Sequence, residues 1–156
     1  MRDEDFMRRA LALAEAAIAV GQAPFGAVVV DADGAVAGEG HNTGAADHDP
    51  TAHGEVVALR AAWARLGDRR RLADCTLYTS CEPCLMCSAA IAQLGLRRVV
   101  FAARGTEVPG ARRLFDADLT GAAAWAAGRP GWRMPEIRGD LLRREALAIM
   151  ARYDWG

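Results

Sequence analysis

The amino-acid sequence predicts one α/β domain in which a mixed sheet lies between two layers of helices. Its length of 156 residues suits a single domain. Short valine-rich runs, typical of buried strands, alternate with longer segments whose apolar residues recur at helical spacing. Helices of this length between strands indicate parallel crossover connections, whereas Asp33-Gly34 indicates an antiparallel hairpin. The two kinds of connection together predict a mixed sheet.

The first half of the chain predicts two amphipathic helices with a hairpin between them. Glycines that follow the last periodic residue mark the end of each helix. The polar segment after the hairpin has no such period and is expected to be a loop. The expected elements are a helix over 1–20 stopped by Gly21, strands over 25–30 and 35–40, a loop over 42–51, and a helix closed by Gly67.

The second half predicts alternating strands and helices, without a repeat, a linker or a second domain. Two Pro-Gly breakers make the stretch 105–131 irregular, with a short alanine-rich helix between them. The domain therefore covers 1–156. The expected elements are strands over 77–80 and 98–103, a helix over 84–94 ending at Gly95, and a last helix with Leu142, Ala146, Ile149 and Tyr153 on one face.

Charge and hydropathy exclude several classes of partner. The chain has 20 acidic and 19 basic residues, a net charge of −1, so no global field gathers nucleic acid or anionic membrane. No apolar run approaches the roughly 18 residues that cross a bilayer. The first five residues carry acids where a signal peptide has a basic stretch. We expect a cytoplasmic protein that does not bind membranes.

Four cysteines in a reducing compartment are expected to be inert, metal-bound or reactive rather than paired in disulfides. Cys75 lies in a strand-like run and is interpreted as a small buried apolar residue. The other three cluster at Cys81, Cys84 and Cys87. Cys81 is expected to pack behind a metal site without binding the ion.

Two fragments carry the chemistry, and each opens a predicted helix. Pro83 is expected at a first helical position, and Cys84 and Cys87, at i and i+3, then project from one face of the first turn. With His53 they make three zinc ligands, and a fourth, open position would hold a water of pKa about 7. Glu55, two residues from the histidine, is expected to shuttle protons to and from that water.

Either fragment alone is ambiguous. An isolated Cys-x-x-Cys also occurs in redox sites and in sites with no function, and His-x-Glu is weaker still. The two fragments together form the signature of the zinc deaminases. A non-catalytic module in which zinc only fixes two helices is the alternative of another class, and Glu55 argues against it because a structural site does not need that carboxylate.

Residues 6–103 resemble the cytidine and deoxycytidylate deaminase superfamily. The segments 24–27, 49–55 and 78–87 are most similar to the subgroup of guanine deaminases and tRNA adenosine deaminases. Between these two, 80–84 looks more like the guanine deaminases, because the tRNA enzymes usually have a hydrophobic residue in place of Cys81. Gly54 departs from the usual alanine of the subgroup and is expected to add room beside the metal.

The resemblance implies a five-stranded sheet, a homodimer, one zinc ion per subunit and a set of substrate contacts. Asn42 would hydrogen-bond the ring, the Ala52 backbone would hold an exocyclic group, and Phe25 would lie against the ring. A downstream acid, Asp116 with Asp118 as second candidate, would bind the guanine edge. The carboxyl-terminal helix and tail, about 139–156, would cap the site, with Tyr153 and Trp155 as aromatic residues able to close over a flat ring.

The resulting hypothesis is a zinc-dependent aminohydrolase that converts guanine to xanthine. The first alternative keeps the chemistry but acts on adenosine in tRNA, with arginines such as Arg112 and Arg113 available for phosphate. Cytosine, guanosine or a triazine are further candidate substrates.

Overall fold

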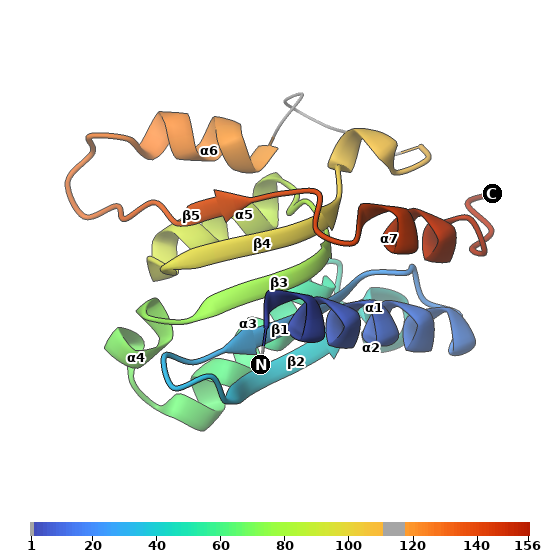
Figure 1. Cartoon of the computed structure of the whole chain (residues 1–156), viewed down its shortest axis with the longest axis horizontal. Coiled ribbons are helices and arrows are strands. Elements are labelled where there is room, and N and C mark those ends of the chain that lie inside the picture. The colour runs from blue at the N-terminus through green and yellow to red at the C-terminus, as the bar shows by residue number, and fades with distance from the viewer. Residues whose placement is uncertain (1, 111–117) are drawn as a thin grey trace.

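The computed structural model describes residues 2–110 and 118–156 and contains a five-stranded mixed sheet (Figure 1). The strand order is β2-β1-β3-β4-β5. The β1 strand pairs antiparallel with β2 and β3, while β3, β4 and β5 run parallel. This arrangement confirms the predicted mixed sheet. The strands are β1 (Gly26–Val30), β2 (Val36–His41), β3 (Thr76–Cys81), β4 (Arg98–Ala103) and β5 (Glu136–Arg138).

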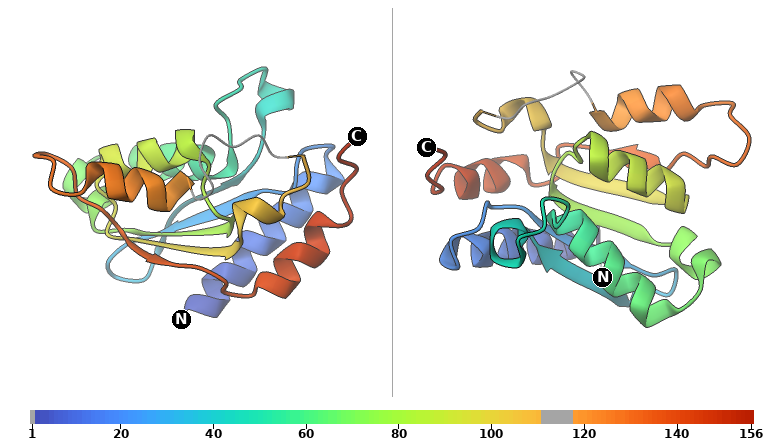
Figure 2. Two further views of the ribbon diagram at one scale, coloured as in Figure 1. Left: turned by 90° about the horizontal axis from the view of Figure 1, so that it is seen from above. Right: turned by 180° about the vertical axis from the view of Figure 1, so that it is seen from behind.

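Helices cover both faces of the sheet, which confirms the three-layer architecture. In the view from above in Figure 2, α1 and α7 lie on one face, and α3, α5 and α6 lie on the other. The helices are α1 (Asp3–Ala19), α2 (Gly44–Asp47), α3 (Gly54–Leu66), α4 (Arg69–Ala73), α5 (Leu85–Leu94), α6 (Asp118–Ala126) and α7 (Arg143–Met150), with a single 3-10 turn at Gly105–Glu107.

Each face of the sheet has its own apolar core. Val28 and Val30 pack with α1 and α7, whereas Ala27 and Val29 pack with α3 and α5. Every residue of β1 is therefore buried. Because both faces of the sheet are covered, the strand sequence is continuously apolar instead of alternating.

Several elements differ from the sequence expectation. The loop after β2 contains the short helix α2, and Arg69-Arg70-Arg71 begins the short helix α4, capped by Asp68, whose side chain accepts from the Arg70 N–H. The last helix is shorter than expected and spans only Arg143–Met150. Leu142 has a positive φ of 56° and so lies before the helix, and Tyr153 lies beyond its end. No described helix is both long enough and apolar enough to span a bilayer.

Asp3 fastens the first turn of α1 to the sheet. Its carboxylate accepts hydrogen bonds from the Tyr78 hydroxyl at 2.7 Å, from both terminal nitrogens of Arg98 at 2.9 Å, and from Arg138 at 2.7 Å. These partners come from three strands. The Arg98 guanidinium, more than any other group, lowers the pKa of Asp3 from 3.8 to about 2.

Asp3→Asn is expected to lower the free energy of unfolding at pH 7 by about 1–2 kcal/mol, because charge-assisted hydrogen bonds are lost at a partly exposed site. A lowered pKa stabilises the fold above about pH 3.8, and this contribution is lost as the pH falls towards 2. Urea titrations at a series of pH values should show the two proteins converging in acid. Glu4→Gln, which removes an exposed partner of Arg8 in the same helical turn, should change little; equal losses in both variants would contradict the assignment.

Candidate metal centre

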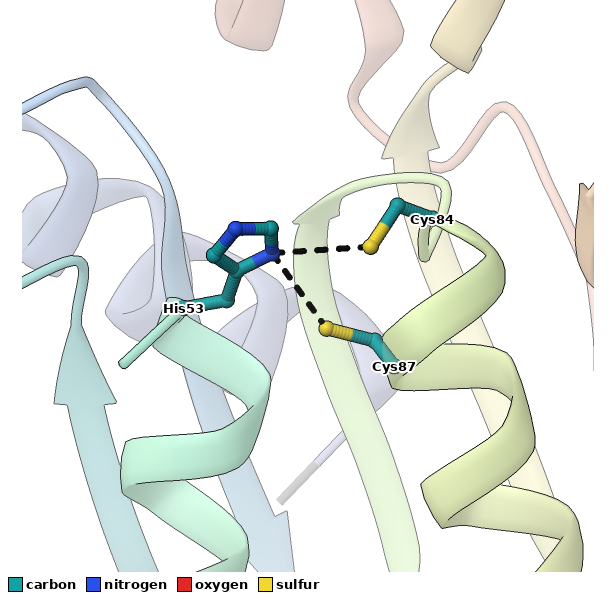
Figure 3. A group of neighbouring side chains, drawn as sticks. All are labelled: His53, Cys84 and Cys87. Atoms are coloured by element: carbon teal, nitrogen blue, oxygen red, sulfur yellow. Dashed lines mark hydrogen bonds between the residues drawn. The ribbon is translucent and has the colours of Figure 1, made fainter. Parts of the chain in front are cut away.

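The start of α3 and the start of α5 present three metal-binding side chains to one another. His53 is the residue that caps α3, and Cys84 caps α5, both with extended backbone dihedrals. Cys87 follows within the first turn of α5. Figure 3 shows the imidazole of His53 facing the two sulfur atoms across the gap between the helices.

The geometry of the three donor atoms fits zinc. His53 Nδ1 lies 3.5 Å from Cys84 Sγ and 3.6 Å from Cys87 Sγ, and all three donor atoms lie within 4.8 Å of one another. With Zn–N of about 2.0 Å and Zn–S of about 2.3 Å, a tetrahedral ion separates nitrogen from sulfur by roughly 3.6 Å. The predicted ligands are therefore brought together at the spacing that zinc requires. Within the described residues no fourth histidine, cysteine or carboxylate joins the group.

Protons are shared among these three side chains, and zinc displaces protons from such groups when it binds. Hydrogen bonds from Cys87 and His53 lower the pKa of Cys84 to about 4. The hydrogen bond to Cys84, together with burial, raises the pKa of Cys87, and the Cys84 contact raises that of His53. Both cysteines lie at a helix amino terminus, where the positive end of the dipole stabilises thiolates.

Glu55 lies beside the ligands but outside the donor group. It is the second residue of α3, its side chain is only 6% exposed, and it interacts with Cys87. Burial is the largest influence on its carboxyl group and raises its pKa. A carboxylate whose pKa is raised is a stronger base than an ordinary one, which suits the acceptance of a proton from water.

The local prediction for Pro83 is wrong. The helix α5 begins at Leu85, so Pro83 precedes the capping residue instead of occupying the first helical position. Cys84 itself has the extended dihedrals of a capping residue, and its sulfur lies 3.5 Å from His53 Nδ1. Ser88, which the sequence analysis missed, holds this turn: its hydroxyl donates to the Pro83 carbonyl at 3.2 Å, and its N–H donates to the Cys84 carbonyl at 2.8 Å. Its position four residues after a ligand was the available signal.

Asn42 lies in the loop after β2, and its side-chain carbonyl oxygen already accepts a hydrogen bond. Its side-chain oxygen accepts from the Gly44 N–H at 2.9 Å, which fixes the orientation of the amide. Its own backbone N–H donates to the Phe25 carbonyl at 2.9 Å. The side chain of Asn42 can therefore meet a ligand through its NH₂ group, which offers donors, and through the second lone pair of its oxygen.

Most of the hydrogen-bonding capacity of the Ala52 backbone is already used within the protein. Its N–H donates to the Asp49 carbonyl at 3.1 Å, and its carbonyl accepts from the Thr43 N–H at 3.0 Å. A carbonyl oxygen has two lone pairs, so one further donor can bind there. Any contact of Ala52 with a ligand is thus limited to that acceptor.

The carboxyl-terminal tail reaches Phe25 from within the same chain. The rings of Trp155 and Phe25 lie 6.0 Å apart edge to face, and the Trp155 Nε1–H donates to the Met150 carbonyl at 3.0 Å. Tyr153 packs against Trp155 at 5.0 Å. Asp116 lies outside the described residues, and Asp118 is the first residue of α6.

Gly54 does not add room beside the metal, contrary to expectation. A methyl group on Gly54 would lie 2.8 Å from the Phe25 carbonyl oxygen and 3.2 Å from its carbon. The space that the missing side chain leaves is therefore filled by the backbone before β1. Cys81 is buried in the apolar core and does not join the three donors, as expected.

Comparison with known proteins gives a consistent result. Residues 1–103 match the family model of the cytidine and deoxycytidylate deaminase zinc-binding region. The chain is 47% identical over 108 residues to guanine deaminase of Bacillus subtilis, which covers 69% of this chain and 68% of the relative. It is 46% identical over 101 residues to tRNA-specific adenosine deaminase of Haemophilus influenzae, which covers 65% of this chain and 58% of the relative.

Solved structures support the same grouping. Guanine deaminase from Nitrosomonas europaea superposes with a TM-score of 0.81 at 32% identity, covering 96% of this chain and 83% of that one. A structure from a study of tRNA:A34 deaminases superposes with a TM-score of 0.78 at 30% identity, covering 93% and 98% of the two chains.

Cys84→Ser is expected to weaken zinc affinity by at least about 100-fold, since the loss of a mere supporting contact already costs 10- to 100-fold. Zinc per chain, measured by elemental analysis after dialysis, should fall well below one. Cys75→Ser is the matched control, because burial raises the pKa of Cys75 to about 11 and its sulfur donates to the Arg71 carbonyl. Full zinc content in Cys84→Ser would contradict the site.

Proposed function

This chain belongs to the cytidine and deoxycytidylate deaminase family, and from that premise we propose that it hydrolyses free guanine to xanthine and ammonia. The family and the zinc-fitting donor group support an aminohydrolase. The choice of guanine depends above all on one contact, the packing of Trp155 against Phe25. The proposal assigns the protein a cytoplasmic role in purine metabolism, as one domain over 1–156 whose four cysteines form no disulfide bond.

His53, Cys84 and Cys87 hold the zinc ion in this proposal, one ion per subunit. When bound, zinc lowers the pKa of a water to about 7 and so supplies a nucleophile at neutral pH. Three protein ligands leave one position of a tetrahedral ion for that water. The exposed sides of His53 and Cys84, both half-buried, leave a path for the substrate to reach it.

Glu55 moves the protons. Its buried carboxylate takes a proton from the attacking water and delivers it to a ring nitrogen. It then takes the remaining proton from the hydroxyl group now on the ring carbon and delivers it to the departing amine, whose bond to that carbon breaks to release ammonia. The water oxygen becomes the new carbonyl of xanthine, so the reaction consumes one water and needs no redox partner. Burial favours the neutral acid of Glu55, so its carboxylate takes up a proton more readily than an exposed carboxylate does.

Asn42, Ala52 and Phe25 hold the ring. The NH₂ group of Asn42 donates to an acceptor on the purine, and the hydrogen bond from Gly44 to the side-chain oxygen holds the amide in that orientation. The free lone pair of the Ala52 carbonyl accepts from the exocyclic amine that will leave. Phe25 lies against the ring face, and Asp116 accepts from the N–H groups of the guanine edge.

The tail favours a free base over a base within a polymer. Trp155 contacts Phe25 edge to face, so the helix and tail over 139–156 extend to the residue that we assign to the ring. A cover at this place suits a small planar substrate and obstructs one that continues into a nucleic acid chain. The net charge of −1 gives no global attraction to phosphates.

Adenosine in tRNA is the second candidate substrate, because the two groups of relatives are almost equally similar, at 47% and 46% identity. That function requires a local basic surface near the site. Of the candidate arginines, Arg112 and Arg113 lie outside the described residues. Arg143, at the start of α7, is paired with Glu107, and Arg104, which follows β4, is paired with Asp140. Neutralised arginines contribute little to phosphate binding.

The proposal includes a homodimer through the layer of α3, α5 and α6. Trp63 is 45% exposed beside an apolar groove of about 480 Å³ between α3 and α5. Trp125 and Trp132 border a second apolar groove, between α5 and α6. Exposed apolar patches of this kind mark interaction surfaces. A molar mass in solution of twice that of one chain would show that the protein is a dimer, as this surface predicts.

Purified zinc-loaded protein should release ammonia from guanine at a rate far above that from adenine, cytosine, guanosine, a triazine or tRNA. The assay compares these substrates at equal concentration. Ammonia release from tRNA but not from guanine would favour the second candidate substrate. Ammonia from none of them would favour the non-catalytic zinc module.

Glu55→Gln should keep both zinc and fold while lowering turnover by about 10²–10⁴-fold, since it removes only the proton shuttle. Zinc content, melting temperature and ammonia release measure the three properties. Loss of zinc and of melting temperature together in this variant would indicate that Glu55 serves the structure, not the reaction.

A further inference from the structure

Two helices from opposite faces of the sheet meet at the first residue of β1 without a side chain between them. On the α1 face, a methyl group on Gly26 would lie 2.3 Å from the Ala10 carbonyl oxygen and 2.5 Å from the Ala14 nitrogen. On the α3 face, a methyl group on Gly54 would lie 2.8 Å from the Phe25 carbonyl oxygen and 3.4 Å from Gly26 Cα. The start of β1 is therefore packed between α1 and α3 so closely that neither side has room for an added methyl group.

The Phe25 carbonyl links this contact to Asn42. Its oxygen, which faces Gly54 on one side, accepts the Asn42 backbone N–H at 2.9 Å. The next residue, Gly26, donates its N–H to the Ser80 hydroxyl at the end of β3. A displacement of the Phe25 carbonyl would therefore move both proposed ring contacts, Phe25 and Asn42.

The helix α3 has little freedom to move away. One turn further along, a methyl group on Gly38 of β2 would lie 2.4 Å from the Ala58 carbonyl oxygen, and one on Gly40 would lie 2.4 Å from Val57. The helix thus packs closely on the hairpin, through the backbone of Ala58 and the side chain of Val57. His53 at its start is also one of the three metal donors.

We propose that Gly54 is a positioning residue that sets the distance between the zinc ligand His53 and the ring contacts Phe25 and Asn42. This inference rests on the proposed function, since it assumes that these two residues hold the substrate. The subgroup usually has alanine at this position, and the glycine lets α3 lie closer to the Phe25 carbonyl in this chain than alanine allows. Added volume at position 54 therefore presses on that carbonyl, weakens the hydrogen bond from Asn42 and misplaces the ring while the metal stays bound.

The test is Gly54→Ala in the zinc-loaded protein, with amide hydrogen exchange and steady-state kinetics as readouts. The Asn42 amide should exchange about tenfold faster than in the unmodified protein. The KM for guanine should rise about fivefold or more, with kcat changed less and with zinc content unchanged. Gly54→Ser adds the same Cβ atom and should behave alike.

Two controls separate positioning from general stability. Ala61→Gly weakens α3 on its exposed side, away from Phe25, and should leave the exchange of Asn42 and the KM unchanged. The Ser88 amide, bonded to the Cys84 carbonyl in the other ligand turn, should keep its exchange rate in Gly54→Ala. Equal acceleration of Asn42 and Ser88 would show a merely structural role and overturn the proposal.

The unmodified protein provides a test that requires no variant. Its Asn42 amide should be strongly protected, and an unprotected amide would overturn the proposal. An unchanged Asn42 amide and an unchanged KM in Gly54→Ala would overturn it as well. If guanine is not a substrate, the exchange measurements still decide whether Gly54 holds the Phe25 carbonyl, so the failure of the substrate assignment is seen separately.

Discussion

The account depends on the convergence of one imidazole and two sulfur atoms where α3 and α5 begin. Neither helix carries a complete site. The sheet makes the site because β1 and β3 are neighbours, so the helices associated with them lie side by side on one face and start at the same end (Figures 2 and 3). The separations of 3.5 and 3.6 Å between nitrogen and sulfur are those of a tetrahedral zinc ion.

The surroundings of the donors agree with this arrangement. Both helix starts direct positive dipole ends at the place where thiolates form and where negative charge develops on a substrate. Glu55 is buried beside Cys87 without joining the donors. A purely structural zinc site has no use for a buried carboxyl group with a raised pKa, so its presence is an argument for catalysis.

Much of the fold and of the metal centre could be predicted from the sequence, because both follow from local patterns. Strand β4 begins and ends at the expected residues, and the three donors were identified from their spacing in two fragments. Strand β5 was implied only by the family resemblance, since Ile137 is the one apolar residue among its three. The helix α4 was missed because a run of arginines carries no apolar period.

What could not be predicted depends on contacts between distant parts of the chain. No local pattern places Trp155 against Phe25, because 130 residues separate them and the tail is brought there by the packing of α7 on α1 and β4. The effect of Gly54 also needed the fold, because whether a missing side chain opens space depends on what fills it. Pro83 was misplaced by about two positions, since Cys84 has an extended backbone and α5 begins only at Leu85.

X-ray absorption at the zinc edge of the purified protein tests the central claim most directly. The account predicts one zinc per chain with two sulfur neighbours at about 2.3 Å and two nitrogen or oxygen neighbours at about 2.0–2.1 Å, of which one is imidazole and the other exchangeable. Zinc surrounded only by oxygen, or by more than two sulfurs, would contradict it.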